Sequence, residues 1–172
     1  RDPAHPLFDR ALMTSYPPGS TFKPTQGLIL LQEGIITTGT AYPCHHGYIS
    51  GRLRVGCHSH ASPLALKPAL QTSCNAFFCY GFKAMIDRRS KYGNSANAFE
   101  VWKKHLVSMG YGYRLGIDLP GESRGFIPND RFYNKIYGKG HWSANTIISV
   151  SIGQGEIGAT PVQIANLCAT IA

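Results

Sequence analysis

Ser20 and Lys23 are the residues whose types and spacing first suggest catalysis. A serine hydroxyl becomes a useful nucleophile when a neighbouring base accepts its proton, and a lysine amine can serve in place of a histidine. Residues three apart lie on one face of a helix, so a helix beginning here brings the two side chains together. Ser-x-x-Lys has only two fixed positions and often arises by chance as an N-cap serine beside a solvated lysine. The rest of the chain must therefore decide its meaning.

The sequence around the pair predicts such a helix. Pro17 and Pro18 form a rigid approach that cannot be helical, and Ser20 stands where an N-cap residue belongs. Pro24 falls in the first turn, where a missing N–H costs little. We therefore expect a buried helix over residues 21–33, with Ser20 at its positive N-terminal end.

Three cysteines and a histidine form a second group of chemical interest. Cys44, Cys57, His60 and Cys74 have the spacing C-x12-C-x2-H-x13-C, and the first three lie in a Cys/His-rich stretch over residues 37–62. Three thiolates and an imidazole are a closed tetrahedral ligand set suited to structural zinc. We therefore expect a structural zinc site.

Other assignments of this stretch stay open. His58 could replace His60 as a ligand, and His45 and His46 are further competitors. A disulfide, such as one between Cys44 and Cys57, or buried free thiols would also account for the cysteines. The chain has five cysteines, an odd number, so they cannot form a pure disulfide framework within one chain.

Composition limits the class of protein. The chain has 172 residues, 43% hydrophobic and 15% charged, which is typical of one globular domain with a substantial core. Neither a signal peptide nor a run of about 18 apolar residues is present. The chain begins at Arg1 without a methionine, and we expect it to be part of a longer protein. The net charge is +8, but the basic residues are scattered, so we expect no nucleic-acid partner.

The remaining pattern predicts mainly helices. The segments below are listed in chain order with the structure that we expect for each. Residues 1–19 are irregular, 48–49 and 53–55 are short strands, a helix starts at Ser62-Pro63, a break covers 73–75 before a second helix to about 86, 87–97 is a loop, 98–109 is an amphipathic helix, 111–129 is a glycine-rich loop or short strand, a polar stretch with Trp142 follows, 147–152 is a strand, and a capping box at 160–163 starts a final helix. Cys79, Phe99, Trp102, Trp142 and Cys168 are expected to pack in the core.

Four stretches in this order carry a resemblance to a known family. They are Tyr-Pro-Pro-Gly-Ser-Thr-Phe-Lys-Pro (16–24), Thr-Ser-Cys-Asn (72–75), Gly-Ile-Asp-Leu-Pro-Gly-Glu (116–122) and Gly-Gln-Gly-Glu with Ala-Thr-Pro-Val-Gln-Ile-Ala (153–165). Together they resemble the transpeptidase domain of class B penicillin-binding proteins, and most of all its elongation-type members. The resemblance implies an α+β fold of the penicillin-binding protein/serine β-lactamase-like kind. Residues 1–172 would form a partial, predominantly helical transpeptidase domain with an incomplete central sheet.

The resemblance also implies an activity. Enzymes of this family are D-Ala-D-Ala transpeptidases that cross-link peptidoglycan stem peptides through a serine acyl-enzyme, and β-lactams acylate the same serine. Carried over to this chain, Ser20 is the nucleophile and Lys23 its proton acceptor. Ser73 relays a proton toward the leaving group, and Asn75 hydrogen-bonds the substrate amide. Cys74 lies between these last two, so a zinc ion there would hold the loop that orients them.

One family motif is missing. The family has a Lys-Thr/Ser-Gly sequence on a strand beside the site, and Lys139-Gly140 lacks its middle residue and context. We expect that motif beyond Ala172, and therefore expect these 172 residues alone to bind β-lactams poorly. Some members carry a zinc ion near the active site, with ligands between the first two motifs, which favours zinc here.

The resemblance implies a location and partners as well. We expect the parent protein to be anchored in the inner membrane by an N-terminal segment outside this chain, to face the periplasm, and to work with proteins of the elongation complex. A β-lactam-sensing domain of the same fold is the alternative, but the 116–122 loop favours the transpeptidase. A class A-like β-lactamase would need a deacylating glutamate, and no glutamate here has that context.

Overall fold

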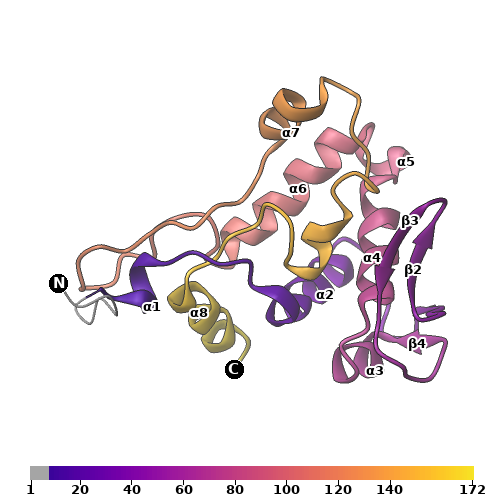
Figure 1. Ribbon diagram of the computed structural model, residues 1–172, viewed down its shortest axis with the longest axis horizontal. Coiled ribbons are helices and arrows are strands. Elements are labelled where there is room, and N and C mark those ends of the chain that lie inside the picture. Colours follow the sequence, from indigo (N-terminus) through magenta and orange to yellow (C-terminus); the bar gives the residue numbers. More distant parts are fainter. Residues whose placement is uncertain (1–7) are drawn as a thin grey trace.

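The computed structural model describes residues 8–172 and consists mainly of helices. The expectation for residues 1–7 lies outside the described part. In chain order the elements are α1 (Arg10–Met13), the 3-10 helix η1 (Gly19–Phe22), α2 (Lys23–Gln32), β1 (Ala41–Tyr42), β2 (Gly47–Ser50), β3 (Leu53–Gly56), β4 (Leu64–Ala65), α3 (Leu66–Gln71), α4 (Asn75–Ile86), α5 (Arg89–Tyr92), α6 (Ser95–Ser108), α7 (Asp130–Tyr137), the 3-10 helix η2 (Ile148–Ile152) and α8 (Pro161–Ile171). Figure 1 shows them along an elongated molecule.

Helix α4 forms the centre of the core. It is apolar on nearly all sides, and a helix of that kind must be buried. Helices α2 and α6, η2 and the β2–β3 hairpin pack around it. Phe99 and Trp102 on α6 are fully buried and stack on each other, as the amphipathic pattern predicted. The Trp102 indole donates a 2.7 Å hydrogen bond to Gln26 Oε1 and so ties α6 to α2.

The strands form two small antiparallel pairs. Strands β2 and β3 cover the two short strands that were predicted, and they pair as a hairpin in which Tyr48 lies opposite Val55. Strands β1 and β4 pair as Ala41 with Ala65 and were not predicted. Figure 1 shows the hairpin beside α4, at the end of the molecule opposite α1 and α8. The expected fold, α+β and predominantly helical with an incomplete sheet, is confirmed for residues 8–172.

The segment around Ser20 differs from its prediction. Ser20 is not an N-cap residue, because it lies inside the 3-10 turn η1 that precedes α2. The α-helix begins at Lys23 and places Pro24 in its first turn, as expected. Gly19 has φ +59°, a left-handed conformation that glycine adopts without strain, and it turns the chain sharply into η1.

Several other predicted elements were wrong. Ser62-Pro63 does not start a helix; β4 follows it, and α3 begins three residues later with Pro68 inside its first turn. Residues 147–152 are mostly 3-10 helix and not strand, because both faces of this apolar segment are buried by other helices. Short helices α1 and α5 lie in segments predicted to be irregular or loop, and α7 lies in the polar stretch for which no helix was predicted. The side chains of Asp9 and Asn129 cap α1 and α7, a local signal that a search for hydrophobic periodicity does not detect.

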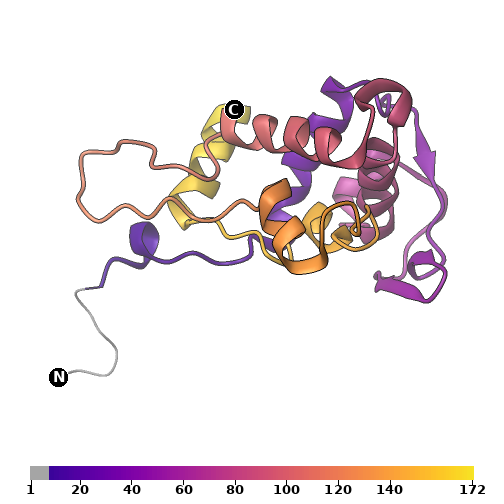
Figure 2. The same cartoon turned by 90° about the horizontal axis from the view of Figure 1, so that it is seen from above.

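The glycine-rich segment, predicted to be loop or short strand, contains no regular helix or strand. Figure 2 shows it projecting from the end of α6 before it returns toward α7. Glu122 organises its base, since its carboxylate accepts hydrogen bonds from the backbone N–H groups of Leu115 (2.5 Å) and Gly116 (3.0 Å). The side chain is therefore a structural cap for the base of this segment. No helix within the described part of the chain has the length and apolar character needed to span a membrane.

Candidate active site

Ser20, Ser73 and Lys23 form one chain of hydrogen bonds. Ser73 Oγ donates to Ser20 Oγ over 3.0 Å, and Lys23 Nζ donates to Ser73 Oγ over 2.8 Å. The ammonium also donates to the Ser73 carbonyl oxygen and to Asn75 Oδ1, both at 2.6 Å. All three N–H bonds of Lys23 therefore have partners, and the connection between Lys23 and Ser20 runs through Ser73.

Different elements bring these groups together. Lys23 is the first residue of α2 and Asn75 the first residue of α4, so each is placed by a buried helix. Ser73 lies in the turn between α3 and α4 at φ +55°, a backbone conformation that costs a residue with a side chain about 1–2 kcal/mol. Such strain persists only where the surroundings impose it, and here the turn brings both the carbonyl and the hydroxyl of Ser73 within reach of Lys23.

Burial changes the acidity of the lysine. Lys23 is only 2% exposed, and desolvation lowers the pKa of its ammonium below the ordinary value. The negative charge of nearby cysteine thiolates opposes this shift. Its hydrogen-bond acceptors are all neutral oxygens and provide no carboxylate to hold the proton. The environment therefore increases the neutral fraction of the amine, which is the form that can accept a proton.

Asn75 joins the hydrogen-bond chain to the hairpin. Its Oδ1 accepts from Lys23, and its Nδ2 donates to the Gly56 carbonyl over 2.8 Å at the end of β3. An amide nitrogen carries two N–H bonds, so one donor is left for another group. The role of the Gly56 carbonyl was not predicted, because the sequence around it gives no sign that the hairpin reaches α4. Ser20 is exposed and Ser73 and Asn75 are half-buried, so a ligand can reach the hydroxyl.

The four predicted metal ligands also come together. One ligand atom from each of Cys44, Cys57, His60 and Cys74 lies within 4.8 Å of all the others. A tetrahedral zinc ion with Zn–S bonds of about 2.3 Å would separate its sulfur ligands by about 3.8 Å, so the cluster has the dimensions of such a site. His60 Nε2 lies 3.3 Å from Cys57 Sγ. The carbonyl of Ala61 lies 2.7 Å from His60 Nδ1, which therefore carries the hydrogen and leaves the Nε2 lone pair facing the sulfurs.

Without a cation, the three thiols differ in acidity. Burial disfavours the Cys57 thiolate, but the hydrogen bond between Cys57 and the His60 ring and those from the backbone N–H groups of Asn75 and Ala76 outweigh it and lower the Cys57 pKa to about 7. Burial raises the pKa of Cys74 to about 12 and also raises that of Cys44. Three thiolates this close need positive charge between them, and a divalent metal supplies it. The donor set, the dimensions and the histidine tautomer all fit zinc.

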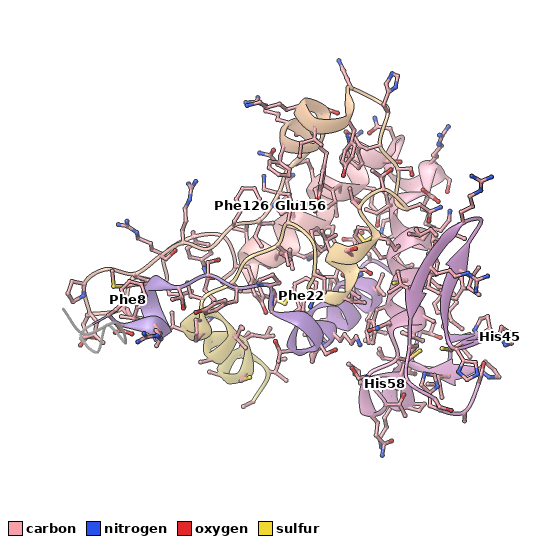
Figure 3. All side chains as sticks on the ribbon, viewed as in Figure 1. Phe8, Phe22, His45, His58, Phe126 and Glu156 are labelled. Carbon is pink, nitrogen blue, oxygen red and sulfur yellow. The ribbon has the colours of Figure 1, made fainter. Side chains whose placement is uncertain are left out.

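The other cysteines and histidines lie apart from this cluster. His45, His46 and His58 are not part of the group of ligand atoms found among the described residues. Figure 3 shows His45 beyond the β2–β3 hairpin and His58 beside α3. Cys79 is buried, as predicted. The prediction for Cys168 was wrong, because its side chain is on the exposed face of α8. None of the cysteines in the described part of the chain forms a disulfide in the structure.

The short sequence Lys139-Gly140 has no connection with Ser20. Both residues line a cavity of about 550 Å³ next to α5 and α7, together with Asp130 and Trp142. None of the residues of the Ser20 hydrogen-bond chain lines that cavity. Trp142 is 7% exposed and belongs to the core, as predicted.

A hydroxyl that is hydrogen-bonded toward a desolvated lysine is an arrangement that acyl-transfer enzymes use. The family profile described as "Penicillin binding protein transpeptidase domain" matches residues 2–172. The chain therefore belongs to the penicillin-binding protein transpeptidase family.

Relatives and solved structures agree with this assignment. The chain is 33% identical to the peptidoglycan D,D-transpeptidase MrdA of Acinetobacter baumannii and 31% identical to MrdA of Escherichia coli K12, with 97% and 96% of the chain covered. It spans only about a quarter of the length of these relatives, 24% and 25%. Among solved structures, Helicobacter pylori PBP2 in complex with MreC has a TM-score of 0.78 and 27% identity over 95% of this chain and 28% of that one. Pseudomonas aeruginosa PBP2 has a TM-score of 0.82 at 24% identity, over 99% of this chain and 37% of that one, which shows the common fold. The resemblance to class B enzymes, and among them to penicillin-binding protein 2, is confirmed.

Proposed function

We propose that the full-length protein is a peptidoglycan D,D-transpeptidase that works through an acyl-enzyme on Ser20. The observation that carries this proposal is the hydrogen-bond chain from Ser20 through Ser73 to Lys23, a lysine that burial makes less basic. The names of the MrdA relatives support the reaction class. The substrate class is the peptidoglycan stem peptide ending in D-Ala-D-Ala.

In the first half of the reaction, Ser20 Oγ attacks the carbonyl carbon of the penultimate D-Ala. The hydroxyl proton passes through Ser73 to the neutral amine of Lys23. As the C–N bond breaks, Lys23 returns this proton through Ser73 to the departing amine of the terminal D-Ala. An ester on Ser20 and a free D-Ala result.

In the second half, an amine of a neighbouring stem peptide attacks the ester. The amine gives up its proton through Ser73 to Lys23, the C–O bond to Ser20 breaks, the proton returns through Ser73 to Ser20 Oγ, and a peptide cross-link forms. The free N–H of the Asn75 amide is placed to hydrogen-bond the substrate backbone, since its other amide groups are held by Lys23 and Gly56. The backbone N–H of Ser20 is one donor for the developing oxyanion.

A β-lactam would acylate the same serine, because its strained amide carries the equivalent carbonyl. Incubation of the full-length protein with a fluorescent penicillin should label Ser20, and mass spectrometry should place the adduct there. Ser20→Ala should abolish labelling, whereas Ser108→Ala, an exposed serine on α6, should leave it intact. Labelling of the Ser20→Ala variant at the wild-type rate would contradict the proposal. Residues 1–172 alone should label poorly, and strong labelling of them would contradict that expectation.

We further propose that the full-length protein acts at the periplasmic side of the inner membrane, held by an N-terminal anchor, in a complex with elongation proteins. The H. pylori PBP2–MreC complex and a structure described as a peptidoglycan synthase complex support the choice of partners. Fractionation of cells after alkaline carbonate washing tests the anchor, and recovery of the protein in the soluble fraction would contradict it.

We also propose that Cys44, Cys57, His60 and Cys74 hold a structural zinc ion. Zinc would supply the positive charge that keeps three thiolates together, and no step of the reaction passes through it. Cys57 Sγ accepts a 3.2 Å hydrogen bond from the Asn75 N–H, so the site would steady the start of α4. Metal analysis of the purified protein should find about one zinc per chain. Cys57→Ser should lose it and Cys168→Ser should keep it; an absence of zinc in the wild-type protein would contradict this proposal.

A further inference from the structure

The segment over residues 153–159 joins η2 to α8 and runs beside the chain that leads into Ser20. Tyr16 N–H donates to the Ala159 carbonyl (3.0 Å), and Ala159 N–H donates back to the Tyr16 carbonyl (2.8 Å). Three residues later, Gly19 N–H donates to the Gly153 carbonyl over 2.8 Å. Both ends of the approach to Ser20 are therefore tied to one segment by backbone hydrogen bonds.

Gly153 packs unusually closely against the Ser20 turn. It has φ +70°, and a Cβ atom built on it would lie 2.4 Å from the Gly19 carbonyl oxygen and 2.7 Å from Phe22 Cβ. These distances are far below van der Waals contact, and one of the atoms is backbone that cannot rotate away. A side chain at this position would push η1 aside. In Figures 1 and 3, η2 and the segment after it lie next to the start of α2 where Phe22 is labelled.

The other side of this segment is anchored to the core. Ser151 is fully buried on η2, and its hydroxyl donates to the Ile148 carbonyl over 2.6 Å and lies 3.5 Å from Cys79 Sγ on α4. Asn75 begins that same helix. Helix η2 therefore packs against α4, which begins at Asn75, and the segment after η2 hydrogen-bonds to the chain that leads into Ser20.

We propose that residues 153–159 are a backbone clamp for the nucleophile, with Gly153 as its positioning residue. The clamp sets where Ser20 Oγ stands relative to Ser73 Oγ, a separation of 3.0 Å in the structure. Proton transfer requires the two oxygen atoms to stay within hydrogen-bond distance, so a small displacement of η1 slows the acylation reaction. Gly153 itself touches no substrate, and the inference rests on the acylation reaction proposed above.

The test compares Gly153→Ala with Gly155→Ala in the full-length protein. Gly155 has φ +72°, so both variants add one methyl group to a left-handed residue of the same loop. A Cβ at Gly155 meets Ser149 Cβ at 3.3 Å and no atom of η1. Stopped-flow acylation with a penicillin separates the dissociation constant of the non-covalent complex from the first-order acylation rate. Thermal melting measures the cost to the fold.

We expect Gly153→Ala to melt at a lower temperature than Gly155→Ala, because its methyl group meets a backbone atom at 2.4 Å, so both rates are measured at a temperature where both variants are folded. The acylation rate of Gly153→Ala should fall by about 10- to 100-fold while its dissociation constant stays near the wild-type value, because only the reacting geometry has moved. Gly155→Ala should react at close to the wild-type rate. Equal acylation rates for the two variants would overturn the clamp. Failure of the wild-type protein to acylate would instead refute the proposed function.

A second pair of variants, at Tyr16, keeps the inference testable if Gly153→Ala does not fold. Tyr16→Pro removes both the exposed side chain and the N–H that bonds to Ala159, whereas Tyr16→Ala removes the side chain alone. The clamp predicts slower acylation for the proline variant than for the alanine variant, at an unchanged dissociation constant. Identical rates for this pair would overturn the inference.

Discussion

The two ends of α2 hold opposite charges in opposite surroundings. Lys23 begins the helix and donates only to neutral oxygens. Glu33 follows its last residue and accepts hydrogen bonds from Lys91, Tyr92 and His105, each at 2.6 Å. Both side chains are largely buried. The helix thus carries one charge that its surroundings disfavour and one that they stabilise.

The pKa shifts describe the same difference. Desolvation lowers the pKa of Lys23 and weakens its hold on a proton. Burial works against ionisation of Glu33 as well, but the hydrogen bonds from Lys91, Tyr92 and His105 outweigh it and lower the pKa to about 2. A destabilised charge suits proton transfer, whereas a satisfied carboxylate stabilises the fold and does no chemistry. Substitutions at the two ends should therefore separate activity from stability.

The largest expected effect is that of Lys23→Met on acylation. Loss of the base should slow labelling by a fluorescent penicillin by about 10²- to 10⁴-fold, the usual contribution of general base catalysis. The free energy of unfolding should change by no more than about 1 kcal/mol, since lost hydrogen bonds are offset by the loss of a desolvated charge. Lys67→Met, an exposed lysine on α3, is the matched control and should label normally. Normal labelling of Lys23→Met would contradict the proposal that Lys23, at the start of α2, is the base.

Glu33→Gln should show the reverse pattern. A neutral amide cannot hold Lys91 and His105 as a carboxylate does, so urea denaturation should give a loss of about 1–2 kcal/mol in unfolding free energy. Acylation of Ser20 should be unchanged at a temperature where the variant is folded. Asp87→Asn breaks the exposed pair with Lys83 and should cost no more than about 0.5 kcal/mol. Equal losses for the two variants would show that the Glu33 cluster is an ordinary surface network.

Acid should weaken the Glu33 end selectively. The pKa of Glu33 falls from an ordinary 4.5 to about 2 in the folded protein, so between these values the unfolded chain binds more protons than the folded one. The contribution of Glu33 is therefore fully present above about pH 5 and is lost as the pH falls toward 2. Urea denaturation at pH 5.5 and pH 3.5 should show a smaller decrease in stability for Glu33→Gln than for the wild-type protein. An equal decrease for the two proteins would show that groups other than Glu33 cause the acid sensitivity.

The smallest expected effect belongs to Tyr92→Phe. This change removes one hydrogen bond to Glu33 and leaves the two nitrogen partners in place. Unfolding free energy should fall by about 0.5–1.5 kcal/mol, less than for Glu33→Gln. Tyr113→Phe, at an exposed tyrosine, should cost nothing measurable. A loss as large as that of Glu33→Gln would mean that the tyrosine, and not the charge, dominates the cluster.

Some features of the molecule followed directly from local sequence. The capping box of Thr160 and Gln163 is present at the start of α8, and the strands of the β2–β3 hairpin lie where they were predicted. Phe99 and Trp102 are in the core because their helical spacing creates one apolar face. The four ligand types of the cysteine and histidine cluster were also predicted, and the structure brings their ligand atoms within reach of one another.

Other features depended on contacts between distant residues. The segment over 147–152 is apolar enough for a strand, but its 3-10 form is set by packing between α2 and α4. The Ser20 turn was predicted as a helix N-cap, and its true geometry comes from Gly153, which lies more than a hundred residues away. Local propensity is a weak prior that tertiary packing overrides at such places.

Residue types and spacing suggested Ser20 and Lys23 as a candidate pair, and the family resemblance added Ser73 and Asn75. Together they indicated the chemistry of the site, because chemistry depends on functional groups. They could not show that Ser73 stands between Ser20 and Lys23, or that Lys23 is 2% exposed. Those facts arise when α2, α4 and η2 pack together, since burial and hydrogen-bond distance are properties of neighbours in space. The pKa of Lys23, and with it the ability of this lysine to act as a base, was decided only by the tertiary structure.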